Sequence, residues 1–324
     1  MNRKIALVAA AISVPFAVGF TAQDVKVDPN LPRYSAVSGV DGSLTSVGSD
    51  TLGNMMTLWG DAFKNYYPNV SFQSEAKGSS TAPPALMENQ SQFGPMSRAM
   101  KDSEKQAFVD QFGYEPTQLR VAIDCIAVYV HKDNPLDEIS IDELVRVFSV
   151  AGGSTKWGDL GVENPSYRNR NVALYGRNSA SGTYEFFKNS ALQGNDYKTT
   201  VREQPGSAGV IQAVSSDRYG MGYSGIGYRT PGVKVLAVSA AEGEEAYMPT
   251  LEAANDGNYP IARFLYVYVN YNSREGLDTA REEFIRMMYS QQGQEVVIKD
   301  GAYPLTLRVA TEELNKVGLE PRTN

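Results

Sequence analysis

Short apolar runs alternate with segments of helical periodicity along most of this 324-residue chain. After Leu52, apolar residues recur every three or four positions until Pro68, which predicts a helix. The apolar run 119–131 is typical of a strand that is buried on both faces. Strands that alternate with helices predict an α/β protein with mainly parallel sheets. The length exceeds what one core usually supports, so we expect two domains.

The same alternation predicts the remaining elements. Further strands are expected at 70–72, 93–96, 172–175, 221–226, 233–238 and 263–270. Further helices are expected after 78–81 and at 102–112, 140–149, 183–192, 208–216 and 277–289. The helix at 140 begins with Ser140 and Glu143 in the spacing of a capping box, which fixes its first turn.

Composition narrows the class of function. The formal net charge is −7, and no run of Lys and Arg interrupts it, so we expect no nucleic-acid partner. A lone cysteine, Cys125, excludes an internal disulfide and lies in an apolar run, where we expect a buried thiol. A lone histidine, His131, excludes His-rich metal sites and is read as a loop residue rather than a catalytic base. We therefore expect no metal, no cofactor and no enzymatic activity.

The N-terminus has the pattern of a secretory signal peptide, assigned to residues 1–22. Arg3 and Lys4 precede an apolar run at 5–20, and small residues lie near its end. An uncleaved membrane anchor is the alternative, but the run is shorter than the roughly 20 apolar residues that span a bilayer. The segment contains no cysteine for a lipid anchor. We expect an exported periplasmic protein that is not a lipoprotein.

The segment 174–187, LYGRNSASGTYEFF, brings together several groups of the kind that bind anions. Arg177 directly follows an apolar run, and Ser181, Gly182 and Thr183 open a segment patterned as a helix. A fixed cation, hydroxyl groups and the free N–H groups of a helix N-terminus together bind a small oxyanion. The segment therefore predicts an oxyanion site.

Three further loops share this design, each between an expected strand and an expected helix. They carry Ser49, Asp50 and Thr51 in the first, Ser79, Ser80 and Thr81 in the second, and Ser97 and Arg98 in the third. In open α/β sheets this position, at the carboxyl ends of the strands, is the ligand crevice. Each loop alone is also explained by helix capping, because Ser, Thr and Asp are common N-caps. Four such loops, two with an arginine, favour a shared binding site.

A carboxylate facing the anion would decide which oxyanion is bound. Phosphate keeps a proton near neutral pH and sulfate does not, so a carboxylate can accept a bond from phosphate but repels sulfate. Asp50 in the first loop and Asp124 in the long apolar run are the candidates. Asp50 could instead be an N-cap, and Asp124 could make a structural hydrogen bond.

These residues resemble the phosphate-binding proteins (PstS type) of the ABC phosphate transporter. The resemblance follows nearly the whole chain after the signal segment in order, and the Arg177–Thr183 loop is its most specific element. The other matching segments are VGSDT at 47–51, KGSS at 77–80, FGPMSR at 93–98, AIDCIAVYVH at 122–131, WGDL at 157–160, GMGY at 220–223 and GAYPL at 301–305. Many family members have an Asp where this chain has Ser97 and Arg98, and that Asp accepts the phosphate proton. Here another carboxylate is needed, and Arg98 would either contact the anion or pair with Asp50 or Asp124.

The resemblance implies a two-lobed periplasmic binding protein of type II. Two mixed sheets flanked by helices would be joined by two hinge strands, with lobe 1 at 39–121 plus 264–319 and lobe 2 at 122–263. It implies a monomer that captures inorganic phosphate between the lobes and delivers it to ABC permease subunits in the inner membrane. Two alternatives remain: a binder of another oxyanion such as sulfate or molybdate, and a phosphatase-type enzyme.

Overall fold

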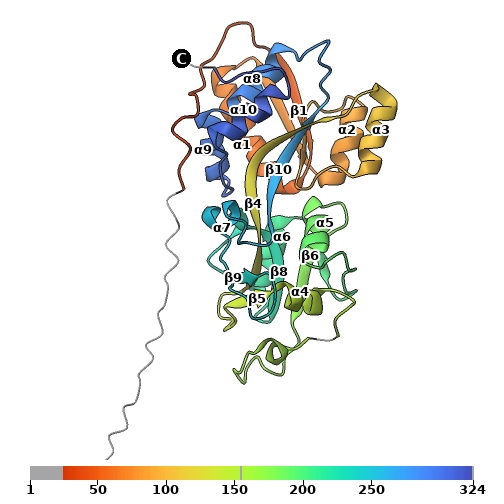
Figure 1. Cartoon of the computed structure of the whole chain (residues 1–324), viewed down its shortest axis with the longest axis vertical. Helices are drawn as coiled ribbons and strands as arrows, with labels where there is room; N and C mark the ends of the chain where they lie inside the picture. Colours follow the sequence, from red (N-terminus) through yellow and green to blue (C-terminus); the bar gives the residue numbers. More distant parts are fainter. Residues whose placement is uncertain (1–24, 154, 323–324) are drawn as a thin grey trace, which may run out of the picture.

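A computed structural model describes residues 25–153 and 155–322 as two lobes, one above the other, joined by two long strands (Figure 1). The expected signal peptide at 1–22 lies outside the described residues. Each lobe has its own hydrophobic core. One is built around Trp59, Phe63 and Phe284, and the other around Phe148 and Trp157. We call these parts lobe 1 and lobe 2; their expected bounds stay a prediction.

Lobe 1 is the upper part in Figure 1 and contains a sheet flanked by helices. Its own strands are β1 (Gly42–Gly48), β2 (Val70–Ala76) and β3 (Gly94–Met96). Its helices are α1 (Gly53–Tyr66), α2 (Ala82–Met87), α3 (Asp102–Phe112), α8 (Thr279–Met288), α9 (Gln291–Lys299) and α10 (Leu307–Asn315). Helix α1 buries Met55, Met56, Trp59 and Phe63, which recur at helical spacing and form the face that meets the core.

Lobe 2 is the lower part and repeats the same layering around other strands. Its own strands are β5 (Glu138–Ser140), β6 (Ala173–Arg177), β7 (Arg202–Gln204), β8 (Gly220–Gly225) and β9 (Val233–Ser239). Its helices are α4 (Ile141–Phe148), α5 (Gly182–Ser190), α6 (Ser207–Ser216) and α7 (Leu251–Asn255). The capping box expected at Ser140 and Glu143 is present at the start of α4.

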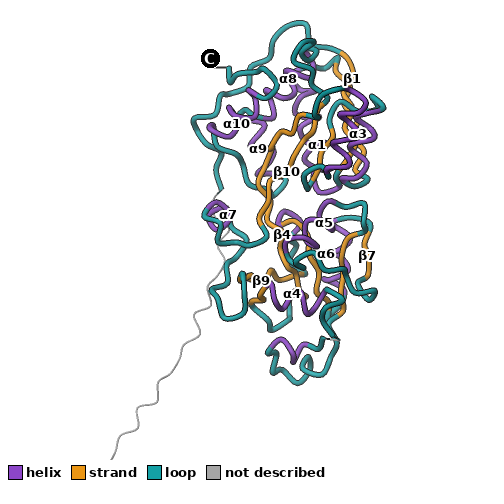
Figure 2. Tube along the Cα trace, turned by 45° about the vertical axis from the view of Figure 1, so that its right-hand side comes forward, coloured by secondary structure: helices purple, strands orange, loops and turns teal. Residues whose placement is uncertain are grey.

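The long strands β4 (Thr117–His131) and β10 (Ala262–Val269) connect the two lobes (Figure 1 and Figure 2). They pair with each other, antiparallel, from Thr117 to Cys125 of β4. From Ile126 onward, β4 pairs with β8 and β9 of lobe 2 instead. The change of partner means that this one strand belongs to both lobes.

The expectation of mainly parallel sheets is wrong, because the eight-stranded sheet is mixed, while the two-stranded β1–β2 sheet is parallel. Four of the strand pairs are parallel, namely β1–β2, β5–β9, β6–β7 and β6–β8. The other four pairs are antiparallel. Every antiparallel pair includes β4 or β10, which run between the lobes in opposite directions. Within the described residues, no helix combines the length and apolarity needed to cross a membrane.

Candidate functional site

Three of the four Ser-rich loops meet at the edge of lobe 1 that faces lobe 2. The amide of Ser49 donates to Pro95 O at 2.7 Å, and the amide of Gly78 donates to Gly48 O at 2.8 Å, which holds the ends of β1, β2 and β3 together. The hydroxyl of Ser49 donates to Ser97 Oγ at 3.0 Å. The Ser97 amide donates to Ser79 Oγ at 3.0 Å. Three buried hydroxyl groups therefore come from three separate loops.

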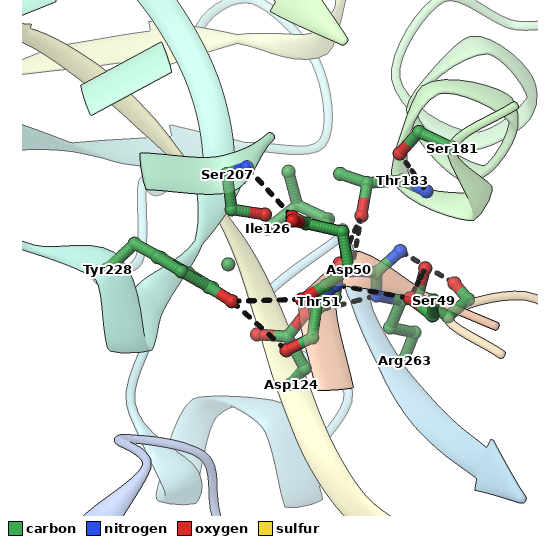
Figure 3. A network of polar contacts seen from close by, with 12 residues as sticks. Ser49, Asp50, Thr51, Asp124, Ile126, Ser181, Thr183, Ser207, Tyr228 and Arg263 are labelled. Carbon is green, nitrogen blue, oxygen red and sulfur yellow. Dashed lines mark hydrogen bonds and ion pairs between the residues drawn. The ribbon is translucent and has the colours of Figure 1, made fainter. Parts of the chain in front are cut away.

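The fourth loop approaches these hydroxyls from lobe 2. Strand β6 ends at Arg177, and Ser181 caps α5 by accepting from the amides of Thr183 and Tyr184. The hydroxyls of Thr183 and Thr51 lie 2.9 Å apart and connect the two lobes (Figure 3). A Cβ on Gly182 would lie 2.3 Å from Ser79 Oγ, so this close approach requires glycine. The expected convergence of loops is thus present in the structure.

The hydroxyls of the site are oriented as donors. Ser79 and Ser181 each accept a backbone N–H at the side-chain oxygen. Ser49 also accepts one, but it already donates its own hydrogen to Ser97. Thr183 Oγ1 accepts from Arg263 at 2.9 Å, and Ser207 Oγ accepts from Arg177 at 2.7 Å. A hydroxyl has only one hydrogen, and an oxygen that already accepts an N–H keeps that hydrogen to donate. The site therefore presents donors, which suits a ligand rich in acceptor oxygens.

Arg177 supplies the positive charge expected in this loop. Its guanidinium donates to Ser207 Oγ and lies 3.2 Å from Asp50 Oδ2, so a lobe 2 cation faces a lobe 1 anion. The side chain is 3% exposed, and burial lowers the pKa of Arg177 while Asp50 opposes that change. Within the described residues its Nε–H has no hydrogen-bond partner. A buried N–H without a partner costs free energy that a bound acceptor would recover.

Asp50 connects lobe 1 to the start of α6 in lobe 2. Its Oδ2 accepts from the Ser207 amide at 2.9 Å, where the N-cap residue of α6, Gly206, has no side chain to do so. Tyr228 of lobe 2 donates to the carbonyl oxygens of Asp50 and Thr51 (Figure 3). The sequence analysis predicted that Asp50 is either a helix N-cap or the acceptor of the phosphate proton. It caps a helix of the other lobe.

Asp124 pairs with Arg263, a residue that the sequence analysis did not select. The two face each other across β4 and β10, and Arg263 donates to Asp124 Oδ2 from Nε at 3.1 Å and Nη2 at 2.8 Å. Arg263 also donates to Ser97 O at 2.6 Å and to Thr183 Oγ1. Burial raises the pKa of Asp124, and Arg263 opposes this. Arg263 thus joins a hinge strand to one loop of each lobe.

Three residues expected in the site have their side chains engaged elsewhere. Thr81 Oγ1 donates to Gly78 O, and Ser80 Oγ donates to Ala180 O on the facing loop. Arg98 donates to Glu104 and to Ala99 O and pairs with Glu185, so the alternative in which it pairs with Asp50 or Asp124 is wrong. Glu104 is in the first turn of α3, which follows Arg98 closely in the same lobe. Membership of these three in a ligand shell stays a prediction.

Ser207 and Arg263 were missed for different reasons. Ser207 follows Gly206 and begins a helix, the same pattern as Gly78 and Ser79, so a sequence signal was present. Arg263 is a buried charge in a strand whose neighbours are apolar, and nothing in the sequence places Asp124 opposite it. Such a cross-strand partner is fixed only by the register.

Candidate metal ligands and the single thiol were located among residues 25–153 and 155–322. No group of three or more His, Cys, Asp or Glu there has the arrangement of a metal site. Cys125 is fully buried, as expected, and burial raises the pKa of its thiol. A buried neutral thiol is a poor nucleophile.

Comparisons with known proteins agree with this geometry. The family model described as a PBP superfamily domain matches residues 35–292. The curated phosphate-binding protein PstS of Pseudomonas aeruginosa is 46% identical over 319 residues, which cover 97% of this chain and 98% of that relative. The PstS of Staphylococcus haemolyticus is 27% identical and covers 78% of each chain.

Solved structures share the fold. A substrate-binding protein of Clostridium perfringens, solved with bound phosphate, matches with a TM-score of 0.68 at 24% identity, over 82% of this chain and 100% of that one. An ABC-type phosphate transport receptor of Vibrio cholerae matches with a TM-score of 0.63 at 19% identity, over the same shares of the two chains. The expected type II two-lobed architecture is confirmed. Taken with the 46% identity along almost the whole chain, these findings show that the chain belongs to the PstS family of phosphate-binding proteins within the PBP superfamily.

Proposed function

We propose that this protein binds inorganic phosphate between its two lobes and delivers it to an ABC permease. The relatives named as phosphate-binding proteins support the ligand, and the matching Vibrio receptor is named for phosphate transport. The chain would act outside the cytoplasm as a monomer and would carry out no chemistry on the anion. Export by a signal peptide at 1–22, without a lipid anchor, is part of this proposal.

The observation that carries the proposal is the orientation of the donors. Hydroxyls from both lobes keep their hydrogens to donate, and the Nε–H of Arg177 is buried without a partner among the described residues. The N-terminus of α5 adds backbone N–H groups and the positive end of the helix dipole. An oxyanion that accepts from both lobes at once would stabilise their contact, which is the basis of hinge closure.

The two candidate carboxylates differ in how much acceptor capacity they have left. Asp124 Oδ2 receives both bonds from Arg263, and the Ile226 amide also donates to this carboxylate. Asp50 Oδ2 accepts from the Ser207 amide, while no residue in the described part of the chain donates a hydrogen bond to Oδ1. A carboxylate oxygen without a donor can accept the proton that phosphate keeps and sulfate lacks. We therefore favour Asp50 over Asp124 as the residue that selects phosphate.

Replacing Arg177 by Ala tests the site. The variant loses the charge and the Nε–H, so phosphate binding should weaken by at least about 2 kcal/mol, or roughly 30-fold in Kd. Calorimetric titration with phosphate, with sulfate as competitor, measures this loss and the selectivity of the wild type. Arg202→Ala is a matched control, because Arg202 is an exposed arginine of lobe 2 that bonds Tyr175. Binding by Arg177→Ala as tight as in the wild type would show that the site is elsewhere, and wild-type preference for sulfate would favour the other-oxyanion alternative.

A further inference from the structure

Four charged side chains form a cluster between the lobes, beside the oxyanion loops. Arg98 follows β3, and Lys101 and Glu104 lie at the start of α3, all in lobe 1. Glu185 lies in the first turn of α5 in lobe 2. We call Arg98, Lys101, Glu104 and Glu185 the interlobe ion cluster.

Contacts inside the cluster divide into two sets. Glu104 accepts from Nη1 and Nη2 of Arg98, each at 2.7 Å, and both residues belong to lobe 1. Arg98 Nε lies 2.9 Å from Glu185 Oε2, and Lys101 Nζ lies 3.0 Å from the same oxygen. Glu104 therefore fixes the guanidinium with its Nε–H directed to the other lobe. Separation of the lobes would break only the two contacts to Glu185.

The surroundings make these contacts more effective than an exposed ion pair. Side chains of Arg98 and Glu185 are 6% and 23% exposed, and the two cations balance the two anions. Exposed pairs contribute little because water screens them, whereas a partly buried network with fixed geometry is screened less. Arg98 is already held by Glu104, so pairing with Glu185 requires little further ordering.

Phosphate binding does not require a carboxylate at position 185. It is a carboxylate one turn after the Ser181 cap of α5, where its charge would repel an anion at that N-terminus. Pairing with Arg98 and Lys101 compensates this charge, and that pairing requires the lobes to be in contact. The cluster therefore favours the lobe arrangement in which the anion is held.

We propose that Glu185 is a positioning residue that slows phosphate release by holding the lobes together through Arg98 and Lys101. The proposal rests on the proposed phosphate function. It also changes the role of Arg98, which was expected at the anion or beside an aspartate and here acts through Glu185. We expect Glu185 to change the rate at which the lobes open and not the rate at which phosphate associates.

The test compares Glu185→Gln, Lys101→Gln and the double variant. Kd for inorganic phosphate is measured by calorimetry, and the release rate by chasing labelled phosphate with an excess of unlabelled phosphate, at low and high NaCl. We expect roughly ten-fold faster release from Glu185→Gln at low salt, an unchanged association rate, and a smaller difference at high salt. Lys101→Gln should speed release in the wild type but not in the Glu185→Gln background. Glu163→Gln is the control, since Glu163 pairs with Arg168 within lobe 2.

Each outcome decides between the proposals. Release from Glu185→Gln at the wild-type rate, or additive effects of the two substitutions, overturns the role of Glu185 while leaving phosphate binding intact. A wild type that binds no phosphate overturns the proposed function, and this proposal with it. Lys101 is half exposed, so Lys101→Gln provides the readout even if Glu185→Gln folds poorly.

Discussion

At the scale of single residues, the charges of the site are matched in pairs. Arg177 faces Asp50, and Arg263 faces Asp124, so the protein groups of the site sum to no net charge. Truncating one partner of a buried pair leaves the other charge uncompensated and is strongly destabilising. For Asp50, a replacement that keeps the shape and the hydrogen bonds therefore tests its role in selectivity with the smallest loss of stability.

Asp50→Asn is expected to reduce the selectivity for phosphate over sulfate. The amide oxygen can still accept from the Ser207 amide, so the cap on α6 is retained. The amide N–H₂, however, donates where the carboxylate would accept the phosphate proton, and it no longer repels sulfate. The ratio of the two dissociation constants should fall by at least roughly ten-fold at pH 7.5, equivalent to about 1.4 kcal/mol. Competition calorimetry measures the ratio; a change in Asp124→Asn but not in Asp50→Asn would assign the proton acceptor to Asp124.

At the scale of elements, the position of the start of α5 depends on Gly182, which has no side chain. A Cβ on Gly182 would lie 2.3 Å from Ser79 Oγ, 2.7 Å from Ser97 Oγ and 3.0 Å from Arg98 Cγ. The first two atoms belong to the side chains of Ser79 and Ser97, which are short and fully buried and have no room to move. Helix α5 can approach lobe 1 this closely only because its first residue is glycine.

Gly182→Ala should therefore weaken phosphate binding without unfolding either lobe. The added methyl group prevents the close approach of α5 to Ser79, so phosphate can bond one lobe well but not both. A loss of at least roughly ten-fold in affinity is expected from the lost contacts. Gly209→Ala in α6 is the control, because its Cβ would have ordinary contacts at 3.5 Å. Equal binding by the two variants, measured by calorimetry, would contradict this account of the glycine.

Most elements were predictable because their signals are local. The helix expected at 102–112 has the observed bounds, and the capping box at Ser140 begins α4 as expected. The strand expected before the Ser49 loop had no predicted bounds, because the sequence of β1, GSLTSVG, is polar and short of apolar residues. Helices α9 and α10 and the short strands β5 and β7 were also not predicted, since packing rather than periodicity fixes such short elements.

The site was predictable in its residue types but less so in its pairings. Four loops with the same Ser-rich design indicated a shared site, and the structure brings their hydroxyls together. The pairing of Arg98 with Glu185 depends on the contact between the lobes, and that of Arg263 with Asp124 on the register of β10 against β4. Neither is encoded over a short stretch of sequence.

At the scale of the whole molecule, the two lobes meet in more than one region. The oxyanion loops and the interlobe ion cluster form one region of contact. Another lies where Gly227 of lobe 2 packs on Asp300 and Gly301, at the end of α9 in lobe 1. Beside it, Asn54 donates to Asp300 Oδ1 at 2.6 Å. A carboxyl group therefore lies at the junction of the lobes, with Asp124 as a nearby charge of the same sign.

This carboxyl group should make the stability of the protein depend on pH in an unusual direction. Burial at the junction raises the pKa of Asp300 to about 6, and Asp124 adds to the rise, while the bond from Asn54 opposes it. The folded protein then binds more protons than the unfolded chain between the ordinary value of 3.8 and about 6. The contribution of Asp300 to stability is therefore full below pH 3.8, falls as the pH rises through this window, and is unfavourable above about pH 6.

Asp300→Asn removes this dependence and keeps an oxygen that can accept from Asn54. The variant should be close to the wild type near pH 4 and become more stable as the pH rises, by about 3 kcal/mol above pH 6, because each unit of the shift in pKa corresponds to about 1.4 kcal/mol. Thermal unfolding midpoints measured from pH 4 to pH 8 give the difference, with Asp61→Asn on the exposed side of α1 as the control. A difference between variant and wild type that stays constant across this range would show that Asp300 titrates alike in the folded and unfolded chain, and so that the junction does not bury its charge.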